Sequence, residues 1–202
     1  MKVDLKQIPG KFSKWLVDSF DPYFASFMLP DGQRFKVTAF DAYVTLAVPI
    51  GGREIMESSR SSTDEEYNQM PVVWVKEWKI EHTALELTHI LKFILVKKDS
   101  GESFKRNFIM YLVNCFLSRL KNRYCSKSIL KYVKDVNKIA SLDWCKFTVH
   151  KLISSVRHYK ESKSAKVVHF DGPLFFLMVS SSTQQPSPFI ELVNNMTKYS
   201  DH

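Results

Sequence analysis

Apolar residues recur at helical spacing in several separate stretches of the chain. The first predicted helix spans residues 11–19. Its apolar face consists of Phe12, Trp15 and Leu16, and Phe20 continues the same spacing just beyond its end. Asp21-Pro22 ends this helix, because the residue before a proline avoids the helical region. Similar patterns predict helices in residues 40–47, 72–78, 84–96, 104–116, 128–136 and 141–157, and a last apolar segment in residues 174–179.

A β-hairpin is expected between the first two helices. Residues 24–29 and 35–37 are short runs rich in strand-forming side chains. Pro30-Asp31-Gly32 between them supplies turn chemistry, since proline presets φ and glycine accepts positive φ. Two strands alone are marginally stable, so the hairpin must pack on helices. The fold class predicted is therefore mainly α, a helical bundle with a small N-terminal β-hairpin.

Polar residues mark the expected helix starts. Thr38 with Asp41 resembles a capping box, with Asp in place of the usual Glu or Gln. Ser103 is the expected N-cap of the helix at 104–116. Ser141 is the expected N-cap of the helix at 141–157, with Asp143 near the positive end of the helix dipole.

Two of these helices carry long apolar stripes. One follows helical spacing through Phe104, Phe108, Leu112, Cys115 and Phe116. We expect it to be core rather than a binding groove, because unpaired apolar stripes of this size are uncommon on soluble domains. The inner face of the later helix is predicted to consist of Cys145, Val149, Leu152, Ile153 and Val156.

The domain organisation expected is a single helical domain in residues 1–179. Within it, residues 58–68 are polar and acidic without periodicity, and they predict an exposed loop. Residues 180–202 begin with a run of Ser, Thr, Gln and Pro and predict a flexible tail.

Targeting signals and cysteines bear on the compartment. The N-terminus has no apolar region of the kind a secretory signal needs, and no apolar run approaches the roughly 20 residues of a membrane span. The three cysteines, Cys115, Cys125 and Cys145, are an odd number without CxxC spacing, which favours reduced thiols. We expect a nuclear or cytoplasmic protein with no membrane partner.

Basic residues are concentrated in the middle of a chain with net charge +8. Residues 97–163 hold sixteen Lys or Arg against five Asp or Glu. This asymmetry indicates an anionic partner such as nucleic acid, or alternatively only solvated helix faces.

The candidate nucleic-acid residues interleave basic and aromatic side chains. They are Arg119, Lys121, Arg123, Tyr124, Lys127 and Lys131, and Tyr132 follows them. The cations would hold phosphates, and an exposed tyrosine could stack on a base. There is no helix-turn-helix, zinc-finger or RNA-binding aromatic signature, so low sequence specificity is expected for DNA or RNA.

Catalytic and metal-binding patterns are weak. The six histidines include no HExxH pair, and the cysteines lie ten and twenty residues apart, so no metal site is predicted. Cys145 and His150 are five residues apart, which turns them about 140° from each other on a helix. His169 and Asp171 are expected in a loop without a nucleophile. Gly51-Gly52 predicts a turn after Pro49 rather than a phosphate loop, and no cofactor is expected.

Several short motifs occur in an order that is similar to a known family. They are Leu29-Pro30-Asp31-Gly32, Thr38 with Asp41, residues 46–52 (LAVPIGG), Arg106-Asn107-Phe108, Asp143-Trp144-Cys145 and Gly172-Pro173-Leu174. Together they resemble the plant mobile domain, also called aminotransferase-like, and its relatives in plant transposon-derived proteins. The resemblance covers about residues 12–179. Ala47-Val48-Pro49 replaces the family's Leu-Gly-Leu-Pro turn, and the last apolar helix breaks at Ser180, as in a truncated copy.

The resemblance implies a binding rather than a catalytic function. The function predicted is a non-catalytic, transposon-derived module, nuclear, that contacts nucleic acid or chromatin proteins. The alternative is a regulatory or interaction domain from a larger protein that bears a SUMO-protease-like cysteine peptidase, which is absent here. A hydrolase with a site assembled from scattered residues is the third hypothesis, and no nucleophile–base pair supports it.

Overall fold

The computed structural model describes residues 10–28, 32–56, 86–96, 101–117, 125–126, 129–162 and 170–182. Its N-terminal part contains α1 (Gly10–Ser19), β1 (Phe20–Asp21), β2 (Ser26–Met28), β3 (Arg34–Lys36) and α2 (Ala39–Leu46). Next come α4 (Leu87–Val96), α5 (Glu102–Leu112) and a π-helical turn, η1 (Val113–Leu117). The last elements are α6 (Leu130–Val133), the 3₁₀ helix η2 (Val136–Ser141), α7 (Trp144–Glu161) and α8 (Leu174–Ser182).

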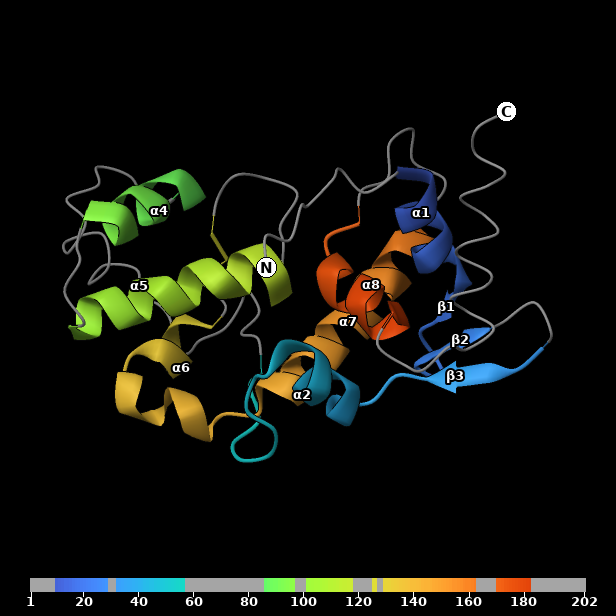
Figure 1. Cartoon of the computed structure of the whole chain (residues 1–202), viewed down its shortest axis with the longest axis horizontal. Helices are drawn as coiled ribbons and strands as arrows, with labels where there is room; N and C mark the ends of the chain where they lie inside the picture. Colours follow the sequence, from blue (N-terminus) through green and yellow to red (C-terminus); the bar gives the residue numbers. More distant parts are fainter. Residues whose placement is uncertain are drawn as a thin grey trace.

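The fold class predicted from the sequence is confirmed: the protein is mainly helical with a small N-terminal sheet (Figure 1). The expected hairpin is β2–β3, in antiparallel register with Phe27 opposite Phe35. A third strand, β1, pairs with β2 and places Phe20 opposite Phe27. The rings of Phe20 and Phe27 pack edge to face at 5.3 Å between centroids, which anchors this sheet in the core.

Two hydrophobic cores lie side by side along the long axis of the molecule (Figure 1). One joins residues of α4, α5, η1, α6 and η2, and its centre includes the fully buried Ile90 and Met110. The other joins α1, the sheet, α7 and α8 around Leu152 and Phe176. Leu46, at the end of α2, packs against both, so the segment after α2 runs along the boundary between the cores.

The helix caps follow the sequence only in part. Thr38 and Asp41 form the predicted capping box of α2: the Asp41 carboxylate accepts from the Thr38 amide at 2.7 Å. The N-cap of α7 is Asp143, which accepts from the Lys146 amide at 2.9 Å, and Ser141, predicted for this role, ends η2 instead. The prediction for Ser103 is also wrong, because α5 begins at Glu102 after Gly101.

The buried face of α5 differs from the predicted stripe. The residues that the helix and its π turn bury are Asn107, Met110, Val113, Asn114 and Leu117, whereas Phe108 and Phe116 are each 40% exposed. A short polar side chain is buried here because Asn107 bonds within its own helix, donating to the Ser103 carbonyl at 2.8 Å. The inner face predicted for α7 is confirmed, with Ile153 only partly buried.

Several predictions lie outside the described residues. These are the acidic loop at 58–68, the helix at 72–78, the turn residues Pro30 and Asp31, and most of the tail. At the C-terminal end α8 continues to Ser182, so the helix does not break at Ser180 as the sequence suggested.

Candidate anion-binding site

A close backbone approach places Arg53 beside the start of α7. Gly52 has a φ of +89°, and a Cβ at this position would overlap the Ser141 carbonyl oxygen. Only glycine fits this conformation and this contact without strain. The Arg53 amide then donates to Ser141 O at 2.9 Å, and the Asp143 amide donates to Arg53 O at 2.9 Å, forming a parallel bridge with residue 142.

Tyr132, on α6, holds the next residues of the same segment. The Met56 amide donates to the Tyr132 hydroxyl at 2.9 Å, and that hydroxyl donates to the Met56 carbonyl at 3.2 Å. Two cations lie over the Tyr132 ring. The Arg53 guanidinium is 5.5 Å from the ring centroid, and the Lys131 ammonium is 5.3 Å from it. Because Tyr132 is only 8% exposed, its ring orients these cations and has no face available for stacking on a base.

A polar cavity of about 360 Å³ opens at this junction. Its volume is within the range of small-molecule sites, roughly 300–1,000 Å³. Its walls come from three segments that are distant in sequence, and the lining residues are Arg53, Lys131, Tyr132, Lys134, Asp135, Lys138, Ser141 and Leu142. Four basic residues and one acidic residue therefore stand among the described residues that line this hollow, so the formal charge of the described lining is positive.

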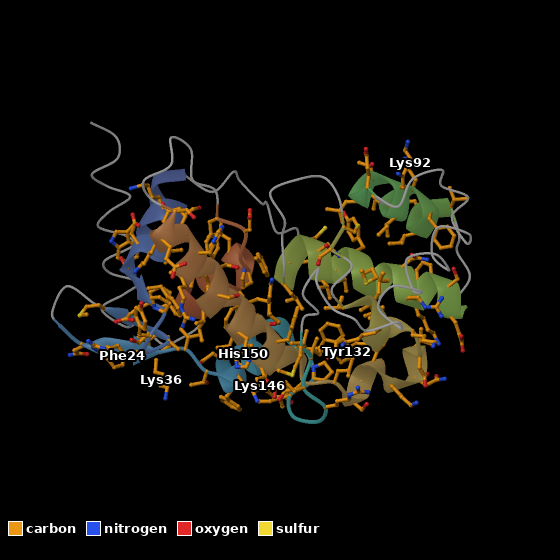
Figure 2. All side chains as sticks on the ribbon, turned by 180° about the vertical axis from the view of Figure 1, so that it is seen from behind. Phe24, Lys36, Lys92, Tyr132, Lys146 and His150 are labelled. Atoms are coloured by element: carbon orange, nitrogen blue, oxygen red, sulfur yellow. The ribbon has the colours of Figure 1, made fainter. Side chains whose placement is uncertain are left out.

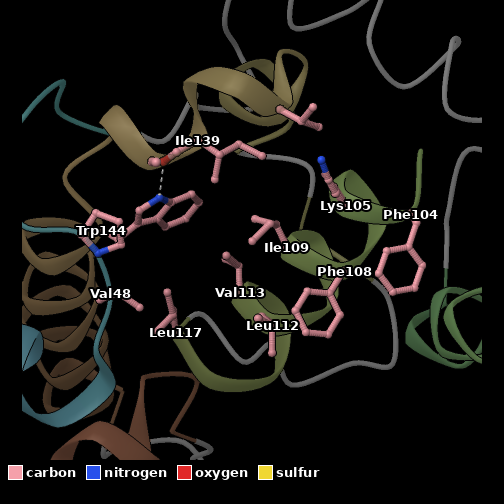
Figure 3. Close-up of a pocket in the computed structure, with 13 residues that line it drawn as sticks. Val48, Phe104, Lys105, Phe108, Ile109, Leu112, Val113, Leu117, Ile139 and Trp144 are labelled. Atoms are coloured by element: carbon pink, nitrogen blue, oxygen red, sulfur yellow. Dashed lines mark hydrogen bonds between the residues drawn. The ribbon is translucent and has the colours of Figure 1, made fainter. Parts of the chain in front are cut away.

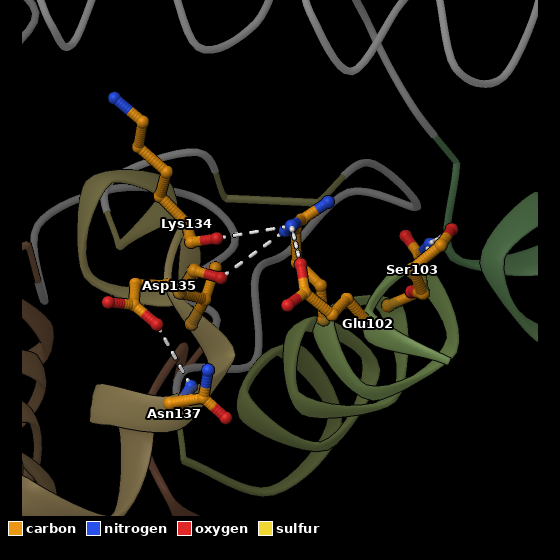
Figure 4. Close-up of polar contacts among 8 residues, drawn as sticks. Glu102, Ser103, Lys134, Asp135 and Asn137 are labelled. Carbon is orange, nitrogen blue, oxygen red and sulfur yellow. Dashed lines mark hydrogen bonds and ion pairs between the residues drawn. The ribbon is translucent and has the colours of Figure 1, made fainter. Parts of the chain in front are cut away.

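Arg106 of α5 fixes the turn that carries two of these residues. Its guanidinium donates from Nε to the Val133 carbonyl at 3.3 Å and from Nη2 to the Lys134 carbonyl at 3.1 Å. These bonds satisfy two carbonyl groups at the end of α6. No further helical turn follows there to supply amide donors for them. Figure 4 shows that the backbone of Lys134 is held in this way while its side chain extends away from Arg106.

Asp135 is the carboxylate of the cavity. It accepts from the Asn137 amide at 3.1 Å, capping η2, and lies 3.1 Å from the Lys138 ammonium. The hydrogen bond from Lys138, and then that from the Asn137 amide, hold the pKa of Asp135 below its usual value. Asp135 is thus paired with Lys138, and among the described lining residues the basic ones outnumber the acidic one.

Glu54 does not neutralise Arg53, although it is the next residue. Its carboxylate lies 3.0 Å from the Lys146 ammonium and 3.7 Å from Nδ1 of His150. Figure 2 shows Lys146 and His150 together on α7. The Glu54 carboxylate therefore contacts side chains of α7, whereas Arg53 lines the cavity.

The structure describes one of the six predicted nucleic-acid residues, Lys131, and it lines the cavity. The other five, Arg119, Lys121, Arg123, Tyr124 and Lys127, lie outside the described residues. Sequence reasoning missed Arg53, Lys134 and Lys138 as site residues. Lys134 and Lys138 continue the spacing of Lys131 along the chain, which is a signal that could have been used, but nothing near Arg53 links it to them.

Two of the three thiols, those of Cys125 and Cys145, are held in their protonated form by burial. Burial, and secondarily Cys115, raises the pKa of Cys125 to about 12. Burial, and secondarily Asp143, raises the pKa of Cys145 to about 11, and its Sγ donates to the Val48 carbonyl at 3.2 Å. His150, five residues further along α7, faces the Glu54 carboxylate instead of this thiol.

Two features are absent from the part of the chain that the structure describes. No three His, Cys, Asp or Glu side chains gather there as metal ligands would. Nor does any helix there have the length and apolar character needed to cross a membrane.

Fold and site together define a mainly helical domain with a basic, polar cavity formed by α6, η2 and residues 52–56. Residues 1–178 match the model of a family described as "Domain of unknown function (DUF8566)", and the chain belongs to this family. No curated protein matches the chain, and no solved structure does so either.

Proposed function

We propose that this protein is a non-catalytic binding module whose polar cavity receives phosphate groups of a nucleic acid. The observation that carries this proposal is the gathering of Arg53, Lys131, Lys134 and Lys138 around one cavity of about 360 Å³. Lysine and arginine supply most phosphate contacts of nucleic-acid-binding proteins, and arginine can donate to two phosphate oxygens at once.

The same residues favour binding with little sequence preference. Charge contacts to phosphates position a nucleic acid but do not read its bases. Tyr132 was a candidate for stacking on a base, and its burial removes it from that role. Binding through the cavity should therefore depend strongly on salt and weakly on sequence.

We further propose that the module is transposon-derived and acts in the nucleus. The resemblance to the plant mobile domain supports a transposon-derived, nuclear protein, with chromatin proteins as further partners. A regulatory role beside a cysteine peptidase is the alternative, and it predicts a protein partner whose binding varies little with salt.

A fluorescence-anisotropy titration tests the proposal. Labelled single-stranded and duplex DNA and RNA would be titrated with the protein between about 50 and 200 mM salt, where each neutralised phosphate changes the affinity measurably. Arg53→Gln is the test variant. Arg34→Gln is its matched control, because the Arg34 guanidinium also lies over an aromatic ring, 4.2 Å from the Phe24 centroid, but on β3.

The proposal predicts tight binding with a steep salt slope for the wild type. Arg53→Gln should reduce the magnitude of that slope by about one, and Arg34→Gln should leave it unchanged. Absence of binding at low salt, or equal effects of the two variants, would contradict the cavity as the phosphate site.

A further inference from the structure

A second cavity, on the other side of η2, is almost entirely apolar. It has a volume of about 390 Å³ and lies between α5–η1 and η2–α7 (Figure 3). Of the thirteen described residues that line it, twelve are apolar, among them Phe108, Ile109 and Leu112 of α5 and Trp144 of α7. Phe104, Phe108 and Leu112 belong to the stripe that the sequence predicted to be core, and the structure places them on this cavity instead.

This hollow is partly open to solvent, since Phe108 on its wall is 40% exposed. The apolar side chains that line it therefore remain in contact with water, and covering apolar surface is favourable. An apolar ligand would remove this surface from water and gain dispersion contacts with the wall.

The helix that lines the cavity departs from α geometry at this point. The π turn η1 begins at Val113 and ends at Leu117, and both side chains line the cavity. Asn114 stabilises the turn on its other side: its Nδ2 donates to the Met110 carbonyl at 2.8 Å, and its Oδ1 accepts from the Ser126 amide at 2.6 Å. Single π turns are rare in proteins and occur frequently at functional sites.

Polar groups are scarce on the cavity wall. The Trp144 indole donates from Nε1 to the Ile139 carbonyl at 2.8 Å, so its polar atom is already satisfied and its ring adds apolar surface. Lys105 of α5 is the one charged residue among the described residues of the lining. Among the described residues no carboxylate forms an ion pair with it, and its side chain is exposed.

We propose that this cavity binds an elongated aliphatic carboxylate, with the hydrocarbon chain between α5–η1 and η2–α7 and the carboxylate at the Lys105 ammonium. The apolar lining selects the chain, and the single cation at the rim selects the sign of the head group. This site is separate from the polar cavity and does not depend on nucleic-acid binding.

Isothermal titration calorimetry with dodecanoate, below its micelle concentration, tests this proposal on the full chain. The expected result is saturable binding of one molecule per chain. Lys105→Gln should weaken binding of dodecanoate roughly fivefold, as expected for a surface ion pair, and leave binding of dodecan-1-ol unchanged. Lys92→Gln, which changes the net charge equally on α4, should affect neither ligand.

Two variants that fill the cavity locate the site. Val136→Phe and Ala140→Phe add bulk to its wall from η2, and each should abolish binding while circular dichroism still shows a folded chain. Dodecanoate binding that persists in both folded variants would overturn the proposal, as would the absence of saturable binding to the wild type. A Lys105→Gln effect that is equal for acid and alcohol would overturn the role of the cation.

Discussion

Tyr132 and Met56 are 76 residues apart and share two hydrogen bonds, in which the tyrosine hydroxyl both accepts from the Met56 amide and donates to its carbonyl. This relationship joins the segment after α2 to α6. Together with the bridge between residues 53 and 142, it brings Arg53 to lysines that are far away in the sequence. The anion site therefore exists only in the folded chain.

Tyr132→Phe should destabilise the protein by about 1 kcal/mol and weaken nucleic-acid binding. The substitution keeps the ring on which Arg53 lies but removes both hydrogen bonds, whose polar partners on the exposed Met56 become solvated. Urea denaturation measures the first effect and anisotropy the second. Tyr43→Phe on α2 is the control, since the Tyr43 side chain is 47% exposed, and it should change neither quantity.

Gly52→Ala should be much more damaging than Gly51→Ala. Both glycines have positive φ, +89° and +79°, so each substitution costs about 1 kcal/mol in backbone strain. At Gly52 the added Cβ also meets the Ser141 carbonyl, whereas at Gly51 it meets nothing within 4 Å. Displacing that backbone should cost about 1–3 kcal/mol more and move Arg53 out of the cavity. Equal thermal stabilities of the two variants would contradict the close approach.

Asp135→Asn should increase the affinity for nucleic acid. The substitution removes the carboxylate of the cavity and releases Lys138 from its ion pair. Asparagine caps helices as well as aspartate does, so the bond to the Asn137 amide can persist. A gain in affinity cannot arise from misfolding, which makes this variant informative. Weaker or unchanged binding in anisotropy titrations would show that the ligand does not enter this cavity.

The Cys125 thiol should make stability fall at alkaline pH. Its pKa is about 12 in the folded chain against an ordinary 9.0, so the folded state holds the proton more tightly than the unfolded state. This contribution is fully present below pH 9 and is lost as the pH rises from 9 toward 12. Denaturant titrations of wild type and Cys125→Ala should give a stability difference that narrows across this range. A constant difference would contradict the burial of the thiol.

The sequence predicted well those features that depend on neighbouring residues. The capping box of Thr38 and Asp41, the helix α1, the hairpin β2–β3 and the inner face of α7 all follow from local pattern. The stripe on α5 was assigned to the wrong face because periodicity alone does not say which of two adjacent faces meets the core. The face that is buried contains Asn107 and Asn114, so it looks polar in the sequence. The hydrogen bonds that these two side chains make within the helix are visible only in the structure.

The candidate site was predicted less completely for the same physical reason. Charge density along the chain identified Lys131 and its neighbours, because they are consecutive in sequence. Arg53 reaches them through a tertiary contact that depends on Gly52 and Tyr132, and no local pattern records such a contact. The separation of the acidic Glu54 from Arg53 likewise arises from its ion pair with Lys146 on α7.

The central claim, that the cavity beside α6 and η2 receives phosphate, is tested most directly by two variants of equal net charge. Lys131→Gln with Lys134→Gln removes two cations from the cavity, and Lys36→Gln with Lys92→Gln removes two from β3 and α4, away from it in Figure 2. Anisotropy titrations of one labelled oligonucleotide at one salt concentration would compare them. A loss of at least tenfold, about 1.4 kcal/mol, for the first variant beyond that of the second is the result predicted. Equal losses would mean that binding follows net charge alone, and the cavity would have no part in it.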